Sequence, residues 1–330
     1  MTPAATGMRI LAIAGAILLG GTLTGPIRAQ TYPNKPVRLI IPFAPGGTAD
    51  ILGRIVSQKL AERLGQPLVP ENRGGAGGDI GAALVTKAKP DGYTLLMPSS
   101  SVATSAALNK DLGYDPVRDL APITTIGQIP LVVIVRASLP VRNIGEFLEY
   151  ARANPGKLNY ASSGVGSAAQ LATELFKTRA GLNIAHVSYK SAGEVLTSLL
   201  SGQTDLGLVG PPTALTQIQA GRVKALVVLK EGRNRVPTMP TVPTTSEAGI
   251  ADCESGVWYG LFAPAGAAPG IIGRLSGEWS RVAAAPDTIE LMKKADIEPM
   301  SSTPENFARF YKAEITRWAE VIKAANLSSE

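Results

Sequence analysis

Two short segments combine glycine, proline and hydroxyl side chains where an apolar run gives way to an amphipathic one. Such a turn lets the backbone approach a ligand closely. The helix behind it offers unpaired N–H groups and a positive dipole end. This chemistry suits a carboxylate or phosphate. The first segment contains Phe43, Ala44, Pro45, Gly46, Gly47, Thr48 and Asp50. The second contains Ser162, Ser163, Gly164, Gly166 and Ser167.

Two further loops are candidate ligand contacts. One contains Ser99 and Ser101, and the other contains Tyr189, Lys190, Ser191 and Gly193. All four loops follow predicted strands, and ligands of open α/β sheets bind at the carboxyl ends of strands. Each loop is also compatible with a plain turn, and Asp50 with a helix cap. We expect two anion-binding loops that hold one ligand from two sides.

Catalytic and cofactor sites are poorly supported. The pattern Gly164-x-Gly166-x-x-Ala169 lacks the acidic residue that a dinucleotide site needs about 20 positions later. His186 and Cys253 are each the only residue of their type, so a zinc site of His and Cys ligands is not expected. No Gly-x-Ser-x-Gly elbow is present. We therefore predict no catalytic residues, no metal and no cofactor.

The first 29 residues have the order of a secretory signal. Arg9 precedes an apolar stretch, Gly25 and Pro26 interrupt it, and Ala29 ends it. The net charge of +6 on 330 residues is mild and forms no basic run, which argues against nucleic acid as a partner. We expect residues 1–29 to be cleaved and the remainder to be periplasmic and monomeric.

Strand and helix patterns alternate along the rest of the chain, which predicts an α/β fold with parallel strands. Strands are expected at 37–41, 68–71, 93–97, 131–135, 158–161, 184–187, 206–209, 225–229 and 261–263. Residues 99–109 are polar and small. Two lobes are the natural division: residues 30–130 with 251–330, and residues 131–250.

An ordered set of motifs over residues 31–330 resembles the Bug family, the periplasmic solute-binding subunits of tripartite tricarboxylate transporters. The motifs are Pro33-x-Lys35-Pro36-Val37-Arg38, Pro42-Phe43-Ala44-Pro45-Gly46-Gly47-x-x-Asp50, Glu71-Asn72-Arg73-Gly74-Gly75-Ala76-Gly77-Gly78, Asn159-Tyr160-Ala161-Ser162-Ser163-Gly164-x-Gly166-Ser167, Tyr189-Lys190 and Trp258-Tyr259-Gly260-Leu261-Phe262-Ala263-Pro264.

The resemblance implies a type II periplasmic binding fold, in which two lobes close on a small carboxylate like a Venus flytrap. It also implies membrane transporter subunits as partners. Residues near the loops depart from the family pattern; for example, Lys190 is followed by Ser191-Ala192-Gly193, where glycine is usual directly after the lysine. The identity of the ligand therefore stays open, and a small solute other than a carboxylate is an alternative. A sensory partner of a membrane receptor and, less favoured, a secreted hydrolase are the alternatives.

Overall fold

The computed structural model describes residues 32–109, 112–230, 232, 235–253 and 255–324. The predicted signal, residues 1–29, lies outside this part. Within it, no helix has the length and apolar character to cross a bilayer. The strands and helices alternate in the order that the sequence predicts, which confirms the α/β class.

One sheet has three parallel strands, with β1 (Val37–Ile41) between β2 (Leu68–Asn72) and β3 (Thr94–Leu96). β9 (Gly256–Pro264) pairs antiparallel with β3 and with the first part of β4 (Leu120–Arg136). The short β10 (Glu298–Pro299) completes this sheet on β4. The candidate loops after β1 and β3 therefore leave the same edge.

The second sheet is built on the end of β4. There β4 pairs antiparallel with β7 (Leu206–Val209) and β8 (Val223–Leu229). β5 (Asn159–Ser162) lies parallel between β7 and β6 (Ala185–Ser188). The candidate loops after β5 and β6 therefore leave neighbouring strands.

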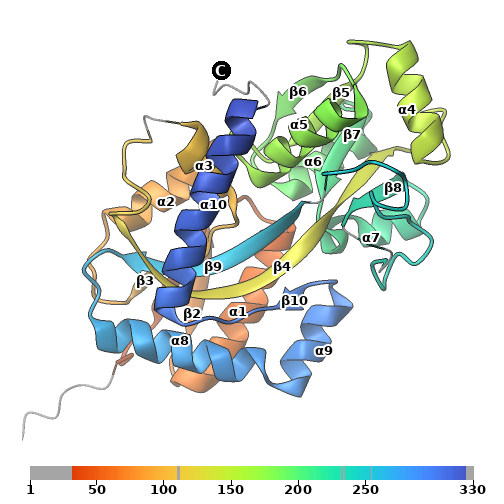
Figure 1. The fold of residues 1–330 in the computed structure, drawn as a ribbon. Coiled ribbons are helices and arrows are strands. Elements are labelled where there is room, and N and C mark those ends of the chain that lie inside the picture. The colour runs from red at the N-terminus through yellow and green to blue at the C-terminus, as the bar shows by residue number, and fades with distance from the viewer. Residues whose placement is uncertain (1–31, 110–111, 231, 233–234, 254, 325–330) are drawn as a thin grey trace, which may run out of the picture.

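The long strand β4 joins the two sheets and runs with β9 across the middle of the molecule (Figure 1). Its partner changes from β9, up to Pro130, to β7 and β8, from Leu131 onward. We propose this change of partner as the boundary between the two predicted lobes. Lobe 1 and lobe 2 below denote the parts of the chain that surround the first and the second sheet.

Helices cover both sheets. Those of lobe 1 are α1 (Thr48–Leu64), the 3-10 turn η1 (Ala76–Gly78), α2 (Asp79–Thr86), α3 (Ser101–Leu108), α8 (Pro269–Ala283), α9 (Pro286–Lys294) and α10 (Pro304–Ala324). Those of lobe 2 are α4 (Ile144–Ala153), α5 (Ala168–Ala180), α6 (Ala192–Leu200) and α7 (Pro211–Gln219). Left-handed Gly65 and Gly181 end α1 and α5, because glycine adopts this conformation without a Cβ clash.

Two predicted strands are shorter than the observed ones, and one helix was not predicted. The strand expected at 131–135 is only the end of β4, and the strand at 261–263 is only part of β9. The first part of β4 contains Pro122 and Pro130, and proline argues against a strand when only the sequence is known. The register of β4 shifts near Pro122, and proline is tolerated at such irregularities. The polar segment 99–109 contains helix α3.

An aromatic cluster holds the C-terminal helix on the first sheet. Phe307 of α10 is fully buried. Its ring centroid lies 4.9 Å from that of Phe262 and 5.7 Å from that of Trp258, both on β9. The indole Nε1 of Trp258 also donates a hydrogen bond to Glu314 of α10, at 3.0 Å. The C-terminal helix thus supports the strand that crosses between the lobes.

Replacing Phe307 with alanine is expected to lower the free energy of unfolding by about 3–5 kcal/mol, because it removes a buried aromatic ring and leaves a cavity. Urea denaturation measures the loss. Phe310→Ala is the matched control, since Phe310 is only partly buried on the same helix and its loss is expected to be smaller. A loss below about 1 kcal/mol for Phe307→Ala would contradict this role.

Candidate functional site

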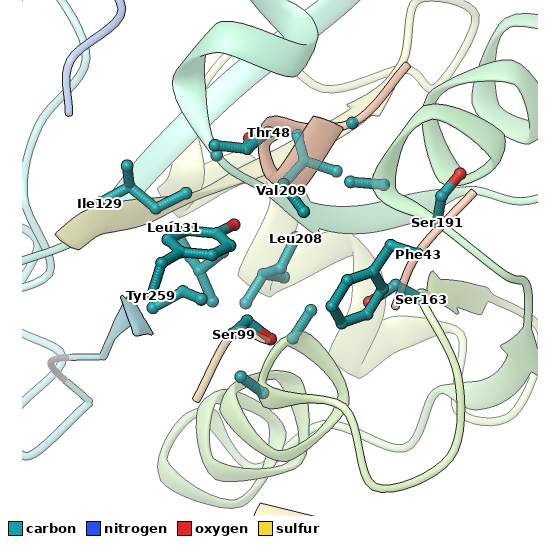
Figure 2. A pocket seen from close by; sticks show the side chains of 17 residues that line it. Phe43, Thr48, Ser99, Ile129, Leu131, Ser163, Ser191, Leu208, Val209 and Tyr259 are labelled. Carbon is teal, nitrogen blue, oxygen red and sulfur yellow. The ribbon is translucent and has the colours of Figure 1, made fainter. Parts of the chain in front are cut away.

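A cavity of ≈ 50 Å³ lies between the two lobes. Figure 2 shows the side chains around it. Lobe 1 contributes Phe43, Thr48 and Ser99, and lobe 2 contributes Ser163 and Ser191. The cavity therefore lies where the four candidate loops meet.

Several helices begin at this cavity. Gly47 to Ala49 form the start of α1, Ala168 and Ala169 begin α5, and Ser191 and Ala192 begin α6. The first amides of a helix have no carbonyl partner within the helix, and each helix start is the positive end of its helix dipole. The helix starts therefore favour a negatively charged group in the cavity, although no cationic side chain lines it.

None of the residues that line the cavity carries a charged side chain. The side-chain hydroxyls available there belong to Thr48, Ser99, Ser163, Ser191 and Tyr259. Lys190, the one cationic residue among the predicted contacts, is exposed and does not line the cavity. Any anion here would be held by neutral donors.

The predicted contact residues fall into two groups. Those at the cavity are Phe43, Gly47, Thr48, Ser99, Ser163 and Ser191. Those outside its lining are Ala44, Pro45, Gly46, Asp50, Ser101, Ser162, Gly164, Gly166, Ser167, Tyr189, Lys190 and Gly193. The second group shapes the loops or lies where the lobes touch.

Asp50 illustrates a supporting role. Its Oδ2 accepts hydrogen bonds from the amide of Gly46 and from Nε of Arg54, each at 3.2 Å. Burial works against ionisation of this carboxyl, but the hydrogen bonds from Arg54, Gly46 and Asn72 outweigh it and lower the pKa of Asp50. The carboxylate therefore fixes the turn before α1.

Serines of the second loop also bond within the protein. Ser167 caps α5 by accepting from the amide of Gln170, at 3.2 Å. Ser162 is fully buried, and its Oγ lies 2.7 Å from Nε2 of His186 and accepts from the amide of Gly164. The ring of His186 stacks on Tyr160, with centroids 4.8 Å apart. The lone histidine thus supports the back of the loop.

The lobes touch on either side of the cavity. The amide of Ala44 donates to the carbonyl of Lys190 at 3.3 Å, and Thr104 Oγ1 donates to the carbonyl of Gly166 at 2.5 Å. Gly77 and Gly164 meet backbone to backbone: a Cβ added to Gly164 would lie 2.5 Å from the amide nitrogen of Gly77. This close approach requires glycine at both positions.

One wall of the cavity consists of strand residues that were not predicted as ligand contacts. It consists of residues of β4, β7 and β9, namely Ile129, Leu131, Leu208, Val209, Val257 and Tyr259. In the sequence these residues are indistinguishable from ordinary core strands. The useful signal is topological, because strands that cross between two lobes form the floor of the cleft between them.

Burial lowers the pKa of His186, and Lys177 lowers it further while Glu174 opposes the shift. Its pKa is therefore lower in the folded than in the unfolded chain, where it is about 6.5. As pH falls through 6.5, the unfolded chain takes up the proton first and the folded state loses stability.

The melting temperature of His186→Gln is expected to fall less than that of the parent protein between pH 8 and pH 5. An equal loss in both proteins would show that His186 contributes nothing to acid sensitivity.

Comparison with known proteins places this chain in a family. The family described as "Tripartite tricarboxylate transporter family receptor" (TctC) matches residues 52–327. The solved structure of the periplasmic binding protein BugD is 34% identical, with a TM-score of 0.86 over 90% of this chain and 99% of that one.

Two solved structures hold small acids. The Rhodopseudomonas palustris protein Rpa4515 "with adipate" is 33% identical, with a TM-score of 0.86 over 90% of this chain and 99% of that one. MatC from the same species, "with bound malate", is 31% identical, with a TM-score of 0.81 over 88% of this chain and all of that one. The chain belongs to the TctC/Bug family of periplasmic solute-binding receptors, which are not enzymes.

Proposed function

We propose that this protein captures a small carboxylate between its two lobes in the periplasm and delivers it to the membrane subunits of a tripartite tricarboxylate transporter. One observation carries the proposal: helices from both lobes begin at a cavity that no charged side chain lines. Buried anions require donors, and these helix starts supply them. The adipate and malate in related structures support this ligand class.

The donors come in two kinds. The first-turn amides of α1, α5 and α6 point their hydrogens toward the cavity end of each helix. The hydroxyls of Thr48 and Ser163 also line the cavity (Figure 2). Hydrogen bonds to a charged partner contribute about 1.5–3 kcal/mol each, so a few suffice for a ligand of this size.

Closure and binding are coupled because each lobe holds only part of the donor set. The α1 amides belong to lobe 1, and the α5 and α6 amides belong to lobe 2. A carboxylate that contacts both sets binds the closed state better than an open one and shifts the equilibrium toward closure. The contacts between the lobes, such as Thr48 Oγ1 at 2.9 Å from Thr213 Oγ1, then add to the closed state.

The first test is calorimetric titration of a panel of small carboxylates. Ser163→Ala is expected to weaken the binding of the tightest one by about 1–3 kcal/mol, because a buried anion loses a donor. Ser188→Ala is the control, since Ser188 is exposed on β6 in the same lobe. Equal affinity in Ser163→Ala and the parent would count against this loop, and no binding by any carboxylate would reject the proposed function.

A second test separates closure from backbone strain. Gly77 has φ of 63°, and a Cβ there would lie 2.4 Å from the carbonyl oxygen of Val165 in lobe 2. Gly181 has φ of 65°, with no atom within 4 Å of its Cβ position. Alanine strains the backbone in both variants, but only Gly77→Ala obstructs closure.

Gly77→Ala is therefore expected to bind the ligand at least about tenfold more weakly, a loss of about 1.4 kcal/mol. Gly181→Ala is expected to keep the parent affinity. Small-angle scattering with saturating ligand is expected to show a larger radius of gyration for Gly77→Ala than for Gly181→Ala. Identical affinities and radii in the two variants would contradict closure at this contact.

A further inference from the structure

A second hollow lies between the lobes, behind the strands that join them. It is a groove of ≈ 870 Å³. Lobe 1 contributes Lys293 of α9, Ile297 and Glu298 of β10. Lobe 2 contributes Leu229, the last residue of β8, and Val236. Because both lobes line it, its width depends on how the lobes are oriented. We call it the rear groove.

The rear groove and the ligand cavity lie on opposite faces of the same two strands. Successive side chains of a strand point to opposite faces of the sheet. On β4, Leu131 lines the cavity, Pro130 lines the groove and Ile129 borders both. On β9, Val257 lines the cavity and Gly256 lines the groove. Pro130 and Gly256 are paired directly across the two strands, so both strands turn the same face to the groove.

The chain crosses between the lobes along this strip of strands. It enters lobe 2 from Pro130 to Leu131 on β4, and it returns to lobe 1 ahead of Gly256 on β9. The amide of Ser255 donates to the carbonyl of Leu229, at 3.4 Å, which joins the two strands of the return. Both crossings therefore lie between the cavity and the groove. A bend at this strip that widens the cavity must narrow the groove, because the two lie on opposite sides of the bend.

The lobes touch at one edge of the rear groove and stand apart along the rest. Asp296, which follows α9, accepts hydrogen bonds from the hydroxyl and the amide of Thr238 in lobe 2. Elsewhere along the groove, Lys293 of lobe 1 and Pro237 of lobe 2 are exposed. The groove is thus open in the same structure in which the lobes touch around the ligand cavity, and it leaves room for the lobes to approach each other there.

We propose that the rear groove sets the balance between the open and closed states. The lobes approach each other in it when the cleft opens, so a bulky group that occupies the groove disfavours the open state and raises ligand affinity. The apparent affinity of such a receptor rises with the fraction of free protein that is already closed. The inference rests on the closure in the proposed function, but it does not depend on which carboxylate binds.

Gln128 is the position at which the groove can be filled. It is exposed on β4, it lines the groove, and its Nε2 donates to Oε2 of Glu298 at 2.7 Å. Cys253 is the only native cysteine and is buried, so N-phenylmaleimide is expected to modify Gln128→Cys at position 128 alone. Mass spectrometry confirms a single addition. The modified and unmodified forms of this variant then differ only in the added bulk. Val69→Cys, at an exposed position of β2, is modified in the same way as the control.

Small-angle scattering without ligand measures the balance between the two states. Modification of Gln128→Cys is expected to decrease the radius of gyration of the ligand-free protein, because the open state loses the space that it needs in the groove. Modification of Val69→Cys is expected to leave the radius unchanged. In calorimetric titrations with adipate and malate, modified Gln128→Cys is expected to bind at least about fivefold more tightly than the unmodified form.

An unchanged or larger radius of gyration in modified Gln128→Cys would overturn the inference, and so would an unchanged or weaker affinity. Circular dichroism checks that the modified protein is folded. The scattering measurement needs no ligand, so it tests the rear groove separately from the proposed function. Failure of every carboxylate in the calorimetric panel to bind would instead reject the proposed function.

Discussion

The proposed site depends on one constraint: a carboxylate bound between the lobes would meet no cationic side chain in the lining of the cavity. Its charge must be balanced by backbone amides and hydroxyls, and a helix start is where unpaired amides gather. This explains why α1, α5 and α6 all begin at the cavity, each after a glycine- or serine-rich turn. Asp50 fixes the turn before α1 by accepting from the amide of Gly46, and Ser167 caps α5 by accepting from the amide of Gln170.

The same constraint shapes the rest of the fold. Donors from two lobes can meet only if the lobes close, and closure brings backbones together at Gly77 and Gly164 with no room for a side chain. The lobes share β4, whose partners change after Pro130, and β9 runs beside its first part. The residues of these strands that line the cavity include the apolar Ile129, Leu131 and Val257. The crossing strands thus give the cavity a partly apolar wall.

Much of this was predictable from the sequence. The turn around Gly46 and Gly47 and the loop at Ser163 were located from glycine and serine placed between a strand and a helix, because this chemistry is local. The contributions of Ile129, Val257 and Tyr259 were not predictable, because an apolar strand residue has the same sequence pattern in a core and in a cleft wall. The contact between the starts of α1 and α6, where a Cβ at Gly47 would lie 3.2 Å from Cβ of Ala192, depends on how the lobes meet, which no local pattern encodes.

The most direct test of the central claim compares an acid with its neutral counterpart. The tightest carboxylate and its primary amide, which has nearly the same shape, are titrated into the mature chain, residues 30–330, by calorimetry at pH 7. If the helix starts hold a negative charge, the amide is expected to bind at least about 100-fold more weakly. The neutral amide is not attracted by the positive ends of the helix dipoles and makes no charge-assisted hydrogen bonds with the first-turn N–H groups. Equal affinities for acid and amide would contradict the account, because the cavity would then select for shape and not for charge.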